Sequence, residues 1–219
     1  MKMTNLLKIV FLFLIVFFHT KANGQHNFKE GYIIDLKSDT IKGEIKYRKW
    51  DIMPKRIEFR KGGEAVSVFY GPADIKGFSV SGNNYLGVIA SLEKSSCKIH
   101  ELDYKADFKL VVDTVFLEEI AGGSKPVYYH KDYKGKLNFF IASDTGIAPL
   151  LYKIYRQEDI DYGRQMTTVA KDERYKAHLY AYLQDCPAIG NSIRKMNYEL
   201  RDFLRLLDEY HSCKKSDRN

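Results

Sequence analysis

The spacing of the apolar residues changes at about residue 170, and this change limits the folds that the chain can adopt. Before it, apolar and polar residues alternate in short runs separated by turn residues, as in Thr40 to Tyr47 and Arg56 to Arg60. A period of two places successive side chains on opposite faces of a strand, which is typical of half-buried antiparallel sheets. Roughly nine or ten such runs occur. They predict an antiparallel β-sandwich or a partly closed barrel over residues 28–156.

Beyond residue 170 the apolar spacing is that of helices. Tyr175, Leu179 and Leu183 fall on one helical face, and Asp185-Cys186-Pro187 predicts a helix start because proline is tolerated at the first helical position. A last helix carries its apolar residues at i, i+3, i+4 and i+7 spacing: Leu200, Phe203, Leu204, Leu207 and Tyr210. We therefore predict a C-terminal helical segment over residues 170–213 and an α+β fold class. The polar residues 157–168 show neither period, so we expect them to form a linker.

Residues 1–24 have the three zones of a secretory signal peptide. Basic Lys2 and Lys8 precede the apolar run Ile9 to Phe18, and small residues follow in Ala22-Asn23-Gly24. As a helix, this apolar run is about 15 Å long, whereas a bilayer core of about 30 Å needs nearly 20 residues. We expect cleavage before Gln25 and no transmembrane helix in the mature chain. The predicted location is the periplasm or the extracellular space, with peripheral attachment to the outer membrane as a further option.

Three cysteines follow this segment, in a compartment where disulfides persist. One unbroken helix over residues 187–212 would hold Cys186 and Cys213 about 40 Å apart, whereas a disulfide needs Cα atoms within about 7 Å. A bond therefore requires a break, which we expect at Asn197 because asparagine tolerates the left-handed conformation that ends helices. We predict an antiparallel helix pair closed by a Cys186–Cys213 disulfide. Cys97 is left free, buried or paired with another chain.

The charge pattern argues against nucleic-acid binding. Removing residues 1–24, which hold three lysines and no acid, lowers the formal charge from +7 to +4, the difference between 32 basic and 28 acidic side chains. Basic and acidic residues are interspersed, as in Lys171-Asp172-Glu173-Arg174, so no basic stripe is expected.

The chain lacks the sequence motifs of the common catalytic sites. It contains no nucleophile elbow, no H-E-x-x-H helix, no P-loop and no dinucleotide-binding glycine turn. Cys97 with His100, and His211 with Cys213, each supply only two ligands, fewer than a closed zinc site needs. We therefore predict no metal and no cofactor, and we assign no catalytic residue. His130 has no partner that its sequence spacing identifies.

A predicted hairpin gathers several aromatic side chains that form a candidate binding surface. These are Tyr128, Tyr129, Tyr133, Phe139 and Phe140. Because neighbouring strand residues face opposite sides, one set of rings would enter the core while the other faces outward. An outward set would be a binding surface, unless the C-terminal helices cover it. Coverage by the helices is the interpretation that we favour.

The opening hairpin resembles that of a group of uncharacterised exported proteins of Bacteroidota-type bacteria. Gly31-Tyr32-Ile33-Ile34 with Ser38-Asp39-Thr40-Ile41-Lys42-Gly43-Glu44-Ile45 is similar to their pattern G-[WY]-x-x-x-x-x-G-D-T-x-x-G-x-I, except that Ser38 stands where glycine is usual. Three later segments also resemble the group: Phe69-Tyr70-Gly71-Pro72, Leu150-Leu151-Tyr152-Lys153 and Asp185-Cys186-Pro187. The resemblance implies export and this architecture, and it carries no assigned activity.

From these observations we predict a non-enzymatic binding or structural module of the cell envelope or the extracellular space. Its expected partner is an envelope protein, a glycan or an apolar ligand. The alternative is a hydrolase acting on an envelope polymer through carboxylates or a histidine that folding brings together. A deep pocket with two convergent acids, or with a histidine and a carboxylate, would favour the hydrolase; a shallow aromatic surface would favour binding.

Overall fold

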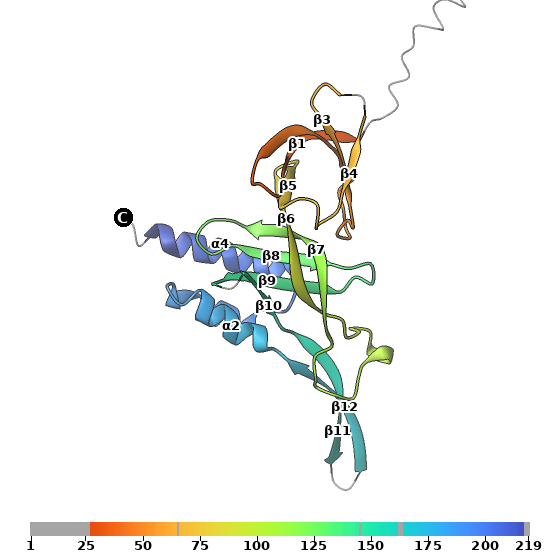
Figure 1. Ribbon diagram of the computed structural model, residues 1–219. Coiled ribbons are helices and arrows are strands. Elements are labelled where there is room, and N and C mark those ends of the chain that lie inside the picture. The colour runs from red at the N-terminus through yellow and green to blue at the C-terminus, as the bar shows by residue number, and fades with distance from the viewer. Residues whose placement is uncertain (1–26, 65, 145, 162–163, 217–219) are drawn as a thin grey trace, which may run out of the picture.

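The computed structural model describes residues 27–64, 66–144, 146–161 and 164–216. Residues 1–24, which we predict to be a signal peptide, lie outside the described residues. Ten strands form one antiparallel sheet in the order β10-β9-β8-β7-β6-β5-β1-β2-β3-β4, and three helices follow (Figure 1). The predicted fold class is confirmed: the chain is an α+β protein with a large antiparallel sheet and a C-terminal helical segment. The sheet is not closed, because its outer strands β10 and β4 do not pair with each other.

Most strands of the large sheet are joined by short turns, and the longest connections are residues 47–56 between β2 and β3 and residues 94–109 between β6 and β7. The strands are β1 (Phe28–Ile34), β2 (Thr40–Lys46), β3 (Ile57–Lys61), β4 (Val68–Tyr70), β5 (Gly77–Val80), β6 (Asn83–Glu93), β7 (Leu110–Ala121), β8 (Val127–Lys131), β9 (Leu137–Ser143) and β10 (Gly146–Leu150). A two-stranded hairpin, β11 (Lys153–Asp161) and β12 (Arg164–Asp172), then leads into the helices α2 (Arg174–Tyr182), α3 (Gly190–Lys195) and α4 (Leu200–Ser216). Short 3₁₀ turns lie at Ile99–Glu101 and Pro187–Ile189.

The sheet curls strongly, so that β10 comes back close to β6. A glycine allows another segment to pass close to β6. A Cβ on Gly87 would lie 2.5 Å from the carbonyl oxygen of Ile75 and 2.6 Å from that of Pro72. Such distances are too short for any side chain to occupy, so residue 87 must be glycine for the connection between β4 and β5 to lie against β6.

Three clusters of buried side chains fill the structure. The first lies among β1, β2, β3 and β5 and centres on Phe78, whose ring stacks on Tyr85 with centroids 4.4 Å apart. The second lies between the sheet and the helices, where Phe139 stacks on Phe203 of α4 with centroids 3.7 Å apart. The third lies inside the curl of β6–β10 and contains Phe140.

A row of directly opposed residues links the first two clusters across one face of the sheet. It runs through Phe139, Tyr129, Glu118, Tyr85, Phe78 and Ile33 on β9, β8, β7, β6, β5 and β1. The packing of the helices and the packing of the N-terminal strands therefore meet on one continuous surface.

The predicted disulfide is present. Cys186 and Cys213 are bonded, with their Cα atoms 6.3 Å apart and a sequence separation of 27. The same helix end is held by Asp185, which accepts a hydrogen bond from the Tyr210 hydroxyl at 3.0 Å and forms an ion pair with Lys214 at 3.2 Å.

The helix break lies between α3 and α4, as predicted, but its cause differs from the one expected. Met196 is extended, with φ −69° and ψ 151°, and Asn197 is not in the left-handed region. Instead, the Asp202 carboxylate accepts a hydrogen bond from the backbone N–H of Asn197 at 2.7 Å. An acidic side chain in the first turn of α4 therefore fixes the connection.

The segment predicted to be a linker is a hairpin instead. Residues 157–161 and 164–168 form the outer half of β11 and β12, which pair from Lys153 opposite Asp172 to Asp161 opposite Arg164. The prediction of a linker was wrong because neither face of this hairpin packs on a core, so its residues need no apolar alternation.

Candidate functional site

A cavity of about 390 Å³ lies where the segment before β3 meets β7 and the end of β8. It is lined by Ile52, Met53, Pro54, Lys55, Pro72, Lys94, Asp113, Thr114, Val115, Phe116, His130, Asp132 and Tyr133. The backbone N–H of Met53 donates to the carbonyl of Lys131 at 2.9 Å, which fixes this segment against β8. The site is therefore built by segments that are far apart in the sequence, and we call it the junction cavity.

His130 is a buried polar residue of the junction cavity, with 8% of its surface exposed. Its Nδ1 lies 3.1 Å from the carbonyl oxygen of Phe116. A carbonyl can only accept, so Nδ1 carries the proton and Nε2 keeps its lone pair. Burial lowers the pKa of His130, which keeps the ring neutral. No hydrogen bond to Nε2 comes from any residue that the structure describes, so this nitrogen can accept one from a ligand.

Asp132 and Lys94 lie beside the histidine. Asp132 Oδ1 accepts from the backbone N–H groups of Lys134 and Lys136 at 2.9 and 3.0 Å, so this carboxylate shapes the turn after β8. Its Oδ2 lies 3.5 Å from the ammonium of Lys94. Asp132 is therefore largely committed to the fold, whereas Lys94 has donors left for a ligand.

A layer of buried polar groups lies next to the junction cavity, where the end of β6 meets the start of β9. The ammonium of Lys136 forms an ion pair with Glu93 at 2.6 Å, and the side chains of the two residues are 7% and 3% exposed. The side-chain oxygen of Asn138 accepts from the backbone N–H of Glu93 at 2.7 Å. Buried charges of this kind are stable only with partners, so the layer holds β6 and β9 in one fixed arrangement.

The lining of the junction cavity is balanced in charge. Lys55 and Lys94 bring two positive charges, and Asp113 and Asp132 bring two negative charges. Met53, Val115 and Phe116 are buried apolar residues of the lining, and the Tyr133 ring is 71% exposed. A site with apolar walls and a few converging polar groups is the usual form of a small-molecule pocket.

The five aromatic residues of the candidate binding surface do not share one surface. Phe139 and Phe140 are fully buried on opposite faces of β9, Phe139 under α4 and Phe140 inside the curl. Tyr128 and Tyr129 are half-buried on opposite faces of β8. Only Tyr133 is largely exposed, and it lines the junction cavity. The C-terminal helices cover one face of the hairpin, which is the interpretation that we favoured, and the curl of the sheet covers the other face.

Glu118 lies between two tyrosines in the row that links the cores. The Tyr129 hydroxyl donates to its carboxylate at 2.9 Å, and Tyr85 is its direct neighbour on β6. Burial raises the pKa of Glu118 and also the pKa values of both tyrosines. Glu118 lines neither the junction cavity nor the hollow between α2 and α3 that is described below.

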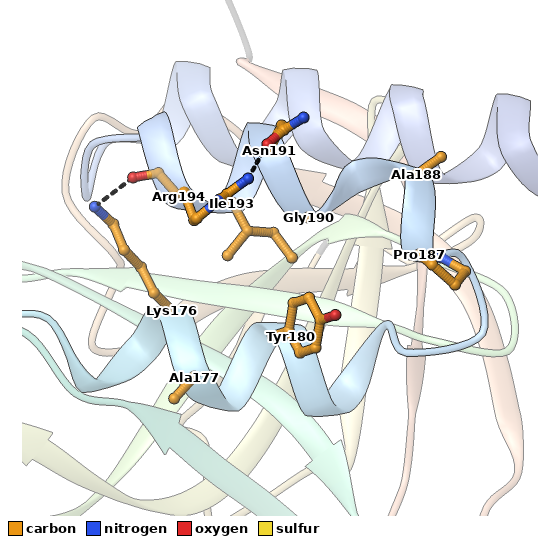
Figure 2. Close-up of a pocket in the computed structure, with 9 residues that line it drawn as sticks. All are labelled: Lys176, Ala177, Tyr180, Pro187, Ala188, Gly190, Asn191, Ile193 and Arg194. Atoms are coloured by element: carbon orange, nitrogen blue, oxygen red, sulfur yellow. Dashed lines mark hydrogen bonds between the residues drawn. The ribbon is translucent and has the colours of Figure 1, made fainter.

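A second hollow, of about 670 Å³, lies between α2 and α3 (Figure 2). Its basic side chains already serve the fold: the ammonium of Lys176 donates to the Arg194 carbonyl at 3.0 Å, and the Arg194 guanidinium donates to Asn191 (Figure 2). Tyr180 lies over Gly190, where a Cβ would come within 3.2 Å of the ring. We regard the junction cavity as the better candidate because it contains a buried polar nitrogen with a free lone pair.

The cysteine and histidine pairs do not form metal sites. Cys213 is oxidised in the disulfide, so it cannot ligate a metal together with His211. Cys97 is exposed, with its sulfur 3.4 Å from the ammonium of Lys136. Within the described ranges, no three histidine, cysteine or acidic side chains are placed to hold a metal ion.

The junction cavity is not evident from the sequence. Tyr133 belongs to the predicted aromatic surface, and the spacing of His130 identifies no partner for it. Lys94, Asp113 and the segment around Met53 carry no pattern that would join them to these two residues. In the part of the chain that the structure describes, no helix combines the length and apolarity needed to cross a membrane.

The chain matches no protein-family model, no curated protein and no solved structure.

Proposed function

We propose that this protein is an exported, non-enzymatic binding module that holds a neutral glycan in the junction cavity. The observation that carries the proposal is the neutral His130 in a lining whose charges cancel. The proposed location, in the cell envelope or outside the cell, is supported by the signal-like residues 1–24, by the disulfide and by the resemblance to exported proteins.

The chemistry of the lining favours a ligand with many hydroxyl groups. A neutral sugar is such a ligand, and each of its hydroxyl groups both donates and accepts. The Nε2 of His130 and the carboxylate of Asp113 can accept, and the ammonium of Lys94 can donate. The apolar walls and the Tyr133 ring can pack against the carbon faces of a sugar. A strongly charged ligand would instead meet charges of its own sign on the same lining.

Binding of oligosaccharides to the mature protein would test the proposal. We suggest isothermal titration calorimetry with a panel of neutral oligosaccharides and with uronic-acid oligosaccharides of matched length. We expect saturable binding of at least one neutral oligosaccharide and weaker binding of its acidic counterpart. His130→Asn, which keeps a donor for Phe116 but removes the Nε2 acceptor, should weaken binding by roughly threefold to tenfold.

Two further variants locate the site. Tyr133→Ala should weaken binding similarly, because it removes the exposed ring at the junction cavity. Tyr180→Ala, which alters the hollow between α2 and α3, serves as the matched control and should leave the affinity unchanged. Equal loss in Tyr133→Ala and Tyr180→Ala, or no binding to any neutral member of the panel, would contradict the proposal.

The alternative function is a hydrolase acting on an envelope polymer. One observation favours it: His130 and two carboxylates, Asp113 and Asp132, line the same cavity, and both acids influence the histidine electrostatically. A hydrolase would release new reducing ends from the same oligosaccharides, and Asp113→Asn would abolish that release. Binding without any release of reducing ends would support the binding module.

A further inference from the structure

The hairpin β11–β12 extends from the body of the molecule as an arm (Figure 1). All residues from 157 to 169 whose exposure is described are exposed, on both faces of the hairpin. Several are apolar: Ile160 is 82% exposed, Met166 48% and Val169 51%. A two-stranded ribbon without a packed face is only marginally stable in water, and sheets of three or more strands are far more stable.

The outer edge of β11 is protected. Near its base, the backbone N–H of Arg156 donates to the Asp103 carbonyl at 2.7 Å, and its guanidinium donates to the Ile99 carbonyl at 3.0 Å. Toward the tip, β11 carries three acidic residues, Glu158, Asp159 and Asp161. Charges on an edge strand discourage further pairing, so a second strand meets both a covered base and an acidic tip here.

The outer edge of β12 has neither protection. Its residues 165–170 read Gln-Met-Thr-Thr-Val-Ala, with no charge, proline or glycine. No backbone group of these residues bonds to a segment other than β11 in the described part of the chain. An uncharged edge strand rich in threonine and valine is the usual template for pairing with another strand.

We propose that β12 pairs antiparallel with β12 of a second copy of this chain, so that the two arms form one four-stranded sheet. The charges of the strand are complementary to themselves in this arrangement. β12 begins with a basic residue, Arg164, and ends with an acidic one, Asp172, which pairs with Arg174 in the single chain. Two β11 edges would instead bring acids against acids.

The register follows from the same charges. Placing residue 164 opposite residue 172 of the other copy centres the pair on Thr168, which then faces its own symmetry mate across the two-fold axis. The nearest alternative registers are shifted by two residues, because directly opposed residues of two identical edges must point their backbone groups the same way. They would place Arg164 opposite Ala170, or Met166 opposite Asp172, and so lose the pair of opposite charges. The centred register therefore predicts that Thr168 of one copy lies directly opposite Thr168 of the other copy.

Sedimentation velocity of the mature chain tests the proposal, in a Cys97→Ser background that prevents thiol-linked dimers. We expect a concentration-dependent dimer. Thr168→Lys places two ammonium groups opposite each other and should weaken the dimer by roughly an order of magnitude. Gln157→Lys is the matched control, because Gln157 is the direct partner of Thr168 within the hairpin and lies on the protected strand. This control should dimerise like the parent.

Cysteine cross-linking provides a second measurement that does not depend on affinity. In the same background, Thr168→Cys should form a disulfide-linked dimer on mild oxidation, whereas Gln157→Cys should remain monomeric. A parent chain that stays monomeric at all concentrations would overturn the proposal. So would equal dimerisation of Thr168→Lys and Gln157→Lys, or equal cross-linking of the two cysteine variants. Oligosaccharide binding at the junction cavity does not enter these readouts, so the two proposals stand or fall separately.

Discussion

At the scale of single residues, the Tyr198 hydroxyl connects the helical segment to the end of the sheet. It accepts a hydrogen bond from the backbone N–H of Phe139 at 3.0 Å and donates one to the Leu150 carbonyl at 2.7 Å. These two residues are opposed at the last position of the β9–β10 pair, where β10 ends. One side chain thus satisfies two backbone groups that would otherwise lack partners.

We predict that Tyr198→Phe destabilises the protein by about 1–3 kcal/mol, because it leaves both backbone groups unpaired. Tyr180→Phe removes a hydroxyl from a ring that is 56% exposed and should change stability by less than about 0.5 kcal/mol. Urea denaturation of both variants measures the difference. Equal stability of the two would show that the hydroxyl of Tyr198 is not a structural link.

His130 should make stability depend on pH. Its pKa is lowered in the folded state by burial, so the folded protein binds a proton less readily than the unfolded chain, whose histidine titrates near pH 6.5. The stabilisation is present above about pH 6.5 and is lost as the pH falls from there through the folded pKa. The free energy of unfolding should therefore fall on acidification, at no more than about 1.4 kcal/mol per pH unit from this group.

In His130→Asn this component of the slope should disappear, because an amide does not titrate. Its side-chain nitrogen can still donate to Phe116. His178→Asn, at an exposed position, is the control and should keep the parental slope. Chemical denaturation at a series of pH values measures all three proteins, and a parental slope in His130→Asn would contradict the assignment.

At the scale of elements, an aromatic stack joins α4 to the sheet. Phe203 is fully buried against Phe139, and it also contacts the rings of Tyr175 and Tyr198. The next residue, Leu204, lies on the outer side of the helix with 42% of its surface exposed. Neighbouring residues of one helix therefore have very different roles in packing.

We predict that Phe203→Ala destabilises the protein by about 3–5 kcal/mol, because it leaves a cavity between α4 and β9. Leu204→Ala should cost less than about 1 kcal/mol, because its side chain is only partly buried. Thermal unfolding followed by far-ultraviolet circular dichroism distinguishes the two. A small effect of Phe203→Ala would mean that the disulfide, not this stack, holds the helix.

At the scale of the whole molecule, the segment around Met53 lies against the end of β8, to which it is hydrogen-bonded, and so closes one side of the junction cavity. We predict that Gly87→Ala destabilises the protein by about 1–3 kcal/mol or more, because the added Cβ would collide with two backbone carbonyls. Gly62→Ala, where an added Cβ meets nothing within 4 Å, should stay within about 0.5 kcal/mol of the parent. Denaturant titration of both checks the prediction. Similar stabilities of the two variants would show that β6 accommodates a side chain at position 87, next to the carbonyls of Pro72 and Ile75.

Local patterns determined several features of this protein without reference to distant contacts. Alternation and turn residues predicted the sheet, the i, i+3, i+4 spacing predicted α4, and chain geometry predicted the Cys186–Cys213 bond with its helix break. The turn between β1 and β2 also has a local constraint. Ser38 lies in the left-handed region, with φ 75°, a conformation that glycine adopts more readily. These features depend on residues within one element or one turn, so the sequence carries them directly.

Only the tertiary structure decided which of the predicted aromatic side chains are covered and where a cavity forms. Alternation indicated that Phe139 and Phe140 face opposite ways, but not that α4 covers one and the curl covers the other. The junction cavity joins residues as far apart as Met53 and His130, and no periodicity relates them. The strands of the β11–β12 arm were not predicted, because a strand with no buried face needs no alternation of apolar and polar residues. Contacts between distant segments depend on how the whole sheet bends, and that bending is set by packing and backbone approach across many strands at once.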